Sequence, residues 1–199
     1  MNLLDIKKNM VKNKKEELPP HVIEMGLNML FVEPINVFER IENGLKDINT
    51  IDDIEELYNI TNKATVLIDI RDKKYNEALD NIALAKQSNE QLCVIVRDIL
   101  LEEYQVYLSR VYQIDGLLFD VSHLTTQMLK NIMFIAISMG ITPILSINSE
   151  MDISKIDWEI TRVVAVKDKN IINKIPNNIK IIKDIDANFD SADVVIKEK

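Results

Sequence analysis

The chain has 199 residues, of which 47% are hydrophobic and 28% are charged, and its formal net charge is −8. This size and composition predict one globular domain with a sizeable core. The acidity disfavours a nucleic-acid surface, because phosphates are neutralised by clustered Lys and Arg, and solubility is the simplest meaning of the charge. Cys93 is the single cysteine, which excludes an internal disulfide and a cysteine-based zinc cluster.

The N-terminal segment predicts an amphipathic helix over residues 1–20. Leu3, Ile6 and Met10 recur at helical spacing, and Pro19-Pro20 stops the pattern. Lysines fill the other positions, which we interpret as a solvated face. A charge interrupts the only apolar cluster and no uninterrupted apolar segment follows, so we expect no signal peptide, no membrane contact and a cytoplasmic protein.

Apolar runs closed by charged residues then alternate with helical stretches. Strands are predicted near residues 28, 65, 92, 116, 142, 162, 180 and 193. The first of them, 27–32, ends at Glu33-Pro34. Helices are predicted over 36–43, 51–60, 75–83, 104–111 and 125–139, and Gly140 is placed to end the last of these.

This alternation predicts parallel βα units, and eight strands indicate a (β/α)8 TIM-type barrel in one domain, 1–199. An open parallel α/β sheet is the alternative. Only residues 184–192 separate the last two strands, which is short for a parallel crossover, and no helix remains after Ile196. We therefore expect a minimal barrel with a complete front and pared-down last units. Oligomerisation is possible, because these short units could leave part of the barrel wall exposed for a second subunit to cover.

The strongest site signal is the end of the strand at 93–99. Its apolar run closes with Arg97 and Asp98, and buried parallel strands deliver ligand-binding groups at their carboxyl ends. Asp69 and Arg71 close the preceding strand in the same way. We expect an ion pair across these strands, either Asp69 with Arg97 or Arg71 with Asp98, and a structural network is favoured over catalysis.

Three other residues have simple structural interpretations. Cys93 starts a strand and is expected to be a small buried hydrophobe rather than a reactive thiol. Trp158 is expected to fill the core. His123 stands before the long helix, where it is either a capping or surface residue or, less often, a general base.

Residues 93–107, followed by 114–119, resemble the third βα unit and fourth strand of indole-3-glycerol-phosphate synthase. That family shows an apolar strand, Lys-Asp-Phe, and Tyr-Gln on the following helix, matched here by Arg97-Asp98-Ile99 and Tyr104-Gln105. Residues 139–146 resemble the fifth unit and 164–171 the sixth. The N-terminal helix is similar to the extra helix that precedes the family's barrel.

The resemblance implies a carboxy-lyase of tryptophan biosynthesis. Such an enzyme closes an indole ring on a carboxyphenylamino-deoxyribulose phosphate with loss of carbon dioxide and water. The reaction needs a general acid, a carboxylate partner and a phosphate cradle. The resemblance implies a small phosphorylated or carboxylated ligand, no cofactor and no metal.

Several family positions are substituted in this chain. The third-strand lysine corresponds to Arg97, which keeps a charge but cannot shuttle a proton. The fifth-strand glutamate falls on Ser146 and the sixth-strand asparagine on Lys167. If the chain is active, the resemblance implies that Arg97 is a fixed cation and that Lys167 or Lys169 replaces the proton donor. The candidate substrate-binding residues are Glu33, Asp69, Lys169 and Lys183.

The segments at the family's phosphate site differ from the family pattern even more. Asp184-Ile-Asp186 stands for the family's Glu-Ser-Gly after the seventh strand, and Lys197-Glu-Lys199 for the Gly-Ser-Ser after the eighth. Backbone amides reach a phosphate most easily where glycine precedes a helix, and carboxylates repel it. Three hypotheses follow: a divergent synthase, an inactive barrel that binds a partner or small ligand, and a different lyase or isomerase that reuses Arg97 and Lys167.

Overall fold

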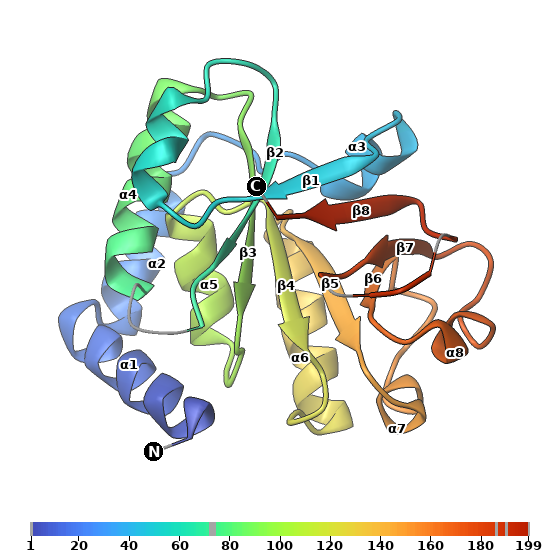
Figure 1. The fold of residues 1–199 in the computed structure, drawn as a ribbon. Helices are drawn as coiled ribbons and strands as arrows, with labels where there is room; N and C mark the ends of the chain where they lie inside the picture. Colours follow the sequence, from blue (N-terminus) through green and yellow to red (C-terminus); the bar gives the residue numbers. More distant parts are fainter. Residues whose placement is uncertain (1, 72–74, 186, 190, 199) are drawn as a thin grey trace.

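The computed structural model describes residues 2–71, 75–185, 187–189 and 191–198, and it contains a closed barrel of parallel strands in the order β1 to β8 (Figure 1). The strands are β1 Asp47–Thr50, β2 Thr65–Asp69, β3 Cys93–Asp98, β4 Gly116–Asp120, β5 Thr142–Ile147, β6 Val163–Val166, β7 Lys180–Lys183 and β8 Val194–Lys197. Because β1 pairs with both β2 and β8, every strand has two neighbours. The barrel prediction is confirmed, and the open-sheet alternative is wrong.

Helices cover the barrel unevenly. They are α1 Leu3–Glu17, α2 Pro20–Asn28, α3 Val37–Glu42, the 3₁₀ helix η1 Ile54–Asn59, α4 Tyr75–Ser88, α5 Tyr104–Val111, α6 Thr126–Ser138, α7 Glu150–Ile153 and α8 Lys169–Ile172. The longer α4, α5 and α6 lie on one side, whereas only the single turns α7 and α8 accompany the later strands (Figure 1). The described residues between β7 and β8 form no helix. The pared-down last units are therefore confirmed.

The predicted first strand is wrong. Residues 27–32 form the end of α2 and an extended segment, in which Met29 is 74% and Phe31 93% exposed. The true first strand, β1, has the sequence Asp-Ile-Asn-Thr, with alternating exposed and buried residues. A strand this short and polar has no apolar run, so the exposed apolar segment gave the stronger signal.

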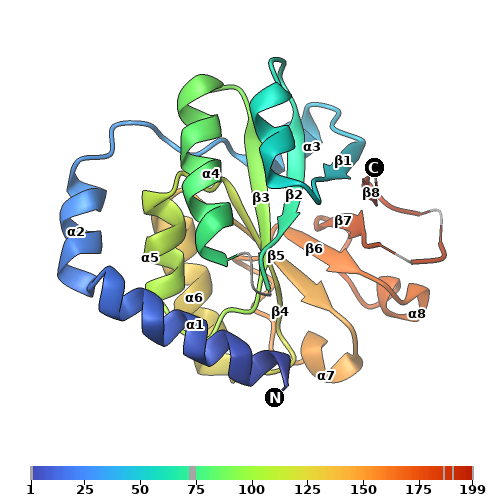
Figure 2. The same cartoon turned by 60° about the vertical axis from the view of Figure 1, so that its left-hand side comes forward.

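The N-terminal helix is confirmed, and its position matters for the site. Helix α1 lies outside the strands and passes along α5, with its N-terminus toward the carboxyl ends of β3 and β4 (Figure 2). Tyr104 of α5 donates its hydroxyl proton toward the carbonyls of Lys14, at 3.2 Å, and Leu18, at 2.8 Å. At the N-terminus of α1, Leu3 and Leu4 line a cavity at the carboxyl ends of the strands.

Side chains on β2 to β6 alternate between two apolar layers, as a pleated strand requires. One layer fills the barrel and includes Ile48, Leu67 and Ile95, which pack with Val37 and Ile41 of α3. The other layer packs the strands against the surrounding helices. Helix α3 therefore plugs one end of the barrel, and ligand access is left to the other.

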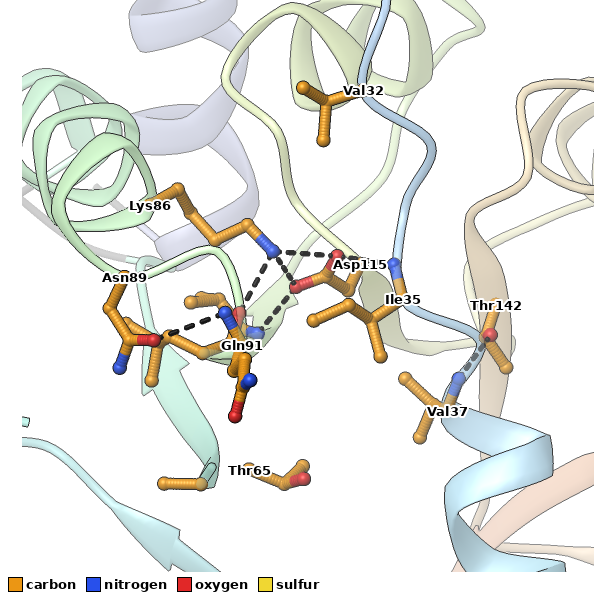
Figure 3. A network of polar contacts seen from close by, with 12 residues as sticks. Val32, Ile35, Val37, Thr65, Lys86, Asn89, Gln91, Asp115 and Thr142 are labelled. Atoms are coloured by element: carbon orange, nitrogen blue, oxygen red, sulfur yellow. Dashed lines mark hydrogen bonds and ion pairs between the residues drawn. The ribbon is translucent and has the colours of Figure 1, made fainter. Parts of the chain in front are cut away.

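A buried polar network holds the plugged end together (Figure 3). The Asp115 carboxylate accepts hydrogen bonds from Lys86 Nζ at 2.8 and 3.0 Å, and from the amides of Val94 and Ile35 at 2.7 Å each. Beside it, the Val37 amide donates to Thr142 Oγ1 at 3.1 Å. Burial raises the pKa of the Asp115 carboxyl, and Lys86 opposes this rise. The network fixes the segment that leads into α3.

Candidate functional site

The carboxyl ends of the eight strands form a ring of inward-facing polar residues, which we call the mouth ring. Each member follows an interior apolar residue by two positions, so the pleat directs it inward. The mouth ring consists of Thr50, Asp69, Arg97, Asp120, Ser146, Lys167, Asp184 and Glu198. Carboxyl ends of barrel strands are where such folds carry their active sites.

Two cavities lie within the mouth ring. The first has a volume of about 320 Å³ and contacts Arg97, Ser146 and Lys167. The second has a volume of about 290 Å³ and lies toward β1 and β2, where Thr50 and Asp69 line it together with Arg97 and Lys167. The three residues predicted to be catalytic therefore converge on one cavity.

Arg97 is held inside the barrel by Asp184. The two side chains form an ion pair in which Arg97 is 9% and Asp184 1% exposed. Asp184 also accepts a hydrogen bond from the Ile185 amide at 2.8 Å. Lys167 Nζ lies 4.0 Å from the other oxygen of Asp184, and its side chain is 50% exposed. Arg97 is thus a fixed cation, whereas Lys167 can reach the cavities and solvent.

The predicted ion pairs between β2 and β3 are wrong, although an ion-pair network is present. Asp69 binds Arg71, whose Nε lies 2.9 and 3.0 Å from the two carboxylate oxygens. Asp98 binds Lys7 of α1. The pleat explains why Asp98 does not meet Arg71, because Asp98 faces the helices. Asp69 and Arg97 are register partners that both face the mouth, but each binds another residue, Asp69 to Arg71 and Arg97 to Asp184.

Lys7 and Asp98 fasten α1 to the end of β3. Lys7 is fully buried, and its Nζ also donates to the Ile70 carbonyl at 3.3 Å. Asp98 accepts hydrogen bonds from the Ile99 amide at 2.7 Å and from Gln105 Nε2 at 3.2 Å. Burial raises the pKa of Asp98 to about 6, and Lys7 opposes this rise. The interpretation of the lysines as a solvated face is therefore wrong for Lys7, and also for Lys14, which is 2% exposed.

The wall on the β4 and β5 side is held by hydrogen bonds of Asp120 and His123. Asp120 accepts from the Ser122 amide at 2.7 Å and from Asn148 Nδ2 at 3.0 Å. His123 lines the first cavity, and its Nε2 lies 2.8 Å from the carbonyl oxygen of Leu100. A carbonyl only accepts, so Nε2 carries the proton in this contact. His123 thereby links its turn to the loop after β3.

Three predicted substrate-binding residues lie outside the two mouth cavities. Glu33 is exposed beside Gly140, at the plugged end of the barrel. Lys169 is exposed at the start of α8. Lys183 follows the interior residue Ile182 by one position, so it points away from the barrel interior, and its Nζ lies 5.8 Å from the ring centre of Phe189. Asp69 is the one member of this predicted set that lies in the mouth ring.

Two known proteins with similar sequences carry the same name. Indole-3-glycerol phosphate synthase of Trichodesmium erythraeum (strain IMS101) is 26% identical over 120 residues, which cover 59% of this chain and 40% of that protein. The synthase of Salinibacter ruber (strain DSM 13855 / M31) is 20% identical over 187 residues, covering 85% of this chain and 69% of that protein. The chain is a divergent relative of the indole-3-glycerol phosphate synthases.

Other comparisons add the fold and the extent of the match. Tryptophan biosynthesis protein TrpCF of Buchnera aphidicola subsp. Schlechtendalia chinensis is 22% identical over 129 residues, covering 63% of this chain and 28% of that protein. This protein and the Trichodesmium synthase are thus matched over less than half of their length. A solved structure from Aquifex aeolicus VF5 has a TM-score of 0.55 at 10% identity, covering 81% of this chain and 86% of that chain. No family model matches the chain.

Carboxylates outnumber cations in the mouth ring. The ring contains the cations Arg97 and Lys167 and the carboxylates Asp69, Asp120, Asp184 and Glu198. Asp186 and Lys199, which belong to the aligned phosphate segments, lie outside the described residues. Within the described residues, no group of three or more metal-binding side chains is found, and no helix is long and apolar enough to span a membrane.

Four residues around the mouth are not predicted as site residues from the sequence. Asp184 was recognised only as a poor phosphate neighbour, Lys7 only as a surface lysine, and Thr50 and Asp120 not at all. One signal could have found Thr50, Asp120 and Asp184: each lies two positions after an interior apolar residue. Lys7 offers no such signal, because its burial depends on where α1 packs.

Proposed function

We propose that this chain is a barrel of indole-3-glycerol-phosphate synthase ancestry that binds a small carboxylate-bearing ligand at its mouth and does not catalyse the family's ring closure. The observation that carries this proposal is the buried ion pair between Arg97 and Asp184. Arg97 occupies the position that the resemblance assigns to a lysine of the family. The site thus keeps its central cation but loses the group that could transfer a proton.

Proton transfer is the first argument for lost catalysis. The family reaction needs a group that donates a proton to a departing oxygen and can be reloaded. A guanidinium stays protonated in proteins, and here it is paired with the buried carboxylate of Asp184. Ser146, at the position of the family's glutamate, has no carboxylate with which to manage charge.

Charge is the second argument. Asp184 directly follows β7, at the place where the family binds phosphate, and it is 1% exposed. A phosphate brought to this position would face a desolvated carboxylate. A ligand with a single carboxylate meets less repulsion, and Lys167 is available to pair with it at the surface of both cavities.

A divergent lyase is the second candidate, and the position of Lys167 favours it. Lys167 is half exposed, lines both mouth cavities and lies 4.0 Å from Asp184, so it could donate a proton with a carboxylate beside it. In this case Arg97 would be the fixed cation for the substrate carboxylate or leaving oxygen.

A turnover assay separates the two candidates. Purified protein is incubated with carboxyphenylamino-deoxyribulose phosphate, and indoleglycerol phosphate is measured in the wild type, Arg97→Ala and Lys167→Met, with Lys63→Met as an exposed-lysine control. We expect no product from any of the four proteins. Turnover in the wild type that is lost in Arg97→Ala and Lys167→Met, but kept in Lys63→Met, would overturn the proposal in favour of the lyase.

A further inference from the structure

We infer that the second mouth cavity binds a small zwitterion of the α-amino acid class, which carries one carboxylate and one ammonium group. This inference rests on the proposed function, because it names the ligand class of the same mouth. The cavity, of about 290 Å³, lies between the ends of β1, β2 and β3 and under Lys167. An orphaned hydroxyl and a balanced set of charges in this cavity carry the argument.

The orphaned hydroxyl belongs to Thr50. Its Oγ1 is buried and has no hydrogen-bond partner among the described residues, and the residue as a whole is 7% exposed. Thr50 follows the interior residue Ile48 by two positions, so it faces the barrel mouth and lines the cavity. A buried hydroxyl without a partner destabilises the free protein, and such a group in a native structure calls for an explanation. A ligand that hydrogen-bonds to Thr50 supplies one.

Charges of both signs line the same cavity in equal number. The cations are Arg71, Arg97 and Lys167, and the carboxylates are Asp52, Asp69 and Glu198. A phosphorylated dianion would meet three carboxylates here, and a dication would meet three cations. A ligand with one charge of each sign matches the cavity in both respects.

Two of these charges are the best placed to bind a ligand. Arg97 is already paired with Asp184 and Asp69 with Arg71. Lys167 is half exposed, with its carboxylate neighbour at 4.0 Å, and Glu198 is exposed and forms no ion pair within the described part of the chain. We assign the ligand's carboxylate to Lys167 and the Thr50 hydroxyl, and its ammonium group to Glu198.

The binding test uses the whole chain and the common L-amino acids, each in large excess, with the melting temperature as the first readout and calorimetry for the amino acid with the largest shift. Its methyl ester, its N-acetyl derivative and inorganic phosphate serve as matched probes. We expect at least one amino acid to raise the melting temperature. We expect both derivatives to bind at least about tenfold more weakly, because each lacks one charge.

Three variants assign the contacts. Thr50→Val keeps the shape and removes the hydroxyl, so the free protein should melt at the same or a higher temperature while affinity falls about threefold to tenfold. Glu198→Gln and Lys167→Met should also weaken binding. Thr61→Val, an exposed threonine away from the mouth, should bind like the wild type.

Three results would overturn the inference: no melting shift with any amino acid, equal affinity for the two derivatives, or tighter binding of inorganic phosphate than of any amino acid. Equal affinity of Thr50→Val and Thr61→Val would overturn it as well. These failures are distinct from failure of the proposed loss of catalysis, which is decided by ring-closure turnover.

Discussion

The two ends of the barrel contain similar side chains but pair them differently. At the plugged end, both carboxylate oxygens of Asp115 are occupied, by Lys86 and by two backbone amides, and Asp115 is fully buried. At the mouth, Arg97 is fixed by Asp184, while Lys167 is half exposed and the Thr50 hydroxyl lacks a partner. A fully satisfied buried network stabilises a fold, whereas incompletely paired groups around cavities are suited to binding. The plugged end therefore stabilises the fold, and the mouth is the end suited to contact a ligand.

The largest expected effect is at the plugged end. Asp115→Ala leaves the buried Lys86 ammonium without its counter-charge, with only the Leu92 carbonyl as acceptor, and removes the acceptor of the Val94 and Ile35 amides. We expect the free energy of unfolding in urea to fall by about 3–5 kcal/mol, as for other broken buried ion pairs. Glu90→Ala, an exposed carboxylate near the same end, should change it by less than about 0.5 kcal/mol. A similar small change in both variants would contradict a stability role for this end.

An intermediate effect is expected at the rim, where Lys7 and Asp98 hold α1. Burial raises the pKa of Asp98 to about 6 from its usual 3.8, so the folded state binds this proton more tightly than the unfolded chain. The stability that this proton contributes is therefore complete below about pH 3.8 and is lost as the pH rises through about 6. Between pH 4 and pH 7 we expect the wild type to lose about 2 kcal/mol relative to Asp98→Asn.

Urea unfolding of both proteins across this pH range measures the difference. Glu90→Gln should follow the wild type at every pH, because it lies at the other end of the barrel and does not touch Asp98. Parallel stability curves for the wild type and Asp98→Asn would show that Asp98 does not take up its proton in this range.

The smallest effect on stability is expected for Lys167→Met. The Lys167 side chain is 50% exposed and lies 4.0 Å from Asp184, and exposed ion pairs contribute little. We expect the free energy of unfolding to change by less than about 0.5 kcal/mol, as in Lys63→Met. Ligand binding at the mouth should nevertheless weaken in Lys167→Met and stay unchanged in Lys63→Met. A loss of stability as large as that of Asp115→Ala would mean that the two ends do not differ as described.

Much of the fold was predictable because local pattern and tertiary structure agree. The strands from β2 to β8 are apolar runs closed by polar residues, and Thr125, Gly140 and Pro19-Pro20 mark helix ends that the structure confirms. The prediction of the first strand is wrong because β1 has a polar, four-residue sequence. Its place is fixed by pairing with β2 and β8, which no local pattern reports.

The candidate site was predictable only in part. Arg97, Ser146 and Lys167 were identified from their family positions, and the structure brings them to one cavity. Their partners depend on long-range packing: Asp184 is 87 residues from Arg97 along the chain, and Lys7 meets Asp98 only because α1 folds back over β3.

The sequence by itself determined the alternating βα order, the shortened last units and the position of Arg97 at the end of a buried apolar run, because each follows from local residue patterns. Tertiary structure decided the direction in which each charged residue faces. Adjacent residues on a strand point to opposite sides. Arg97 therefore faces the mouth and pairs with Asp184, whereas Asp98 faces outward and pairs with Lys7. Barrel closure then brought Thr50 and Glu198 to the cavity where the proposed ligand binds.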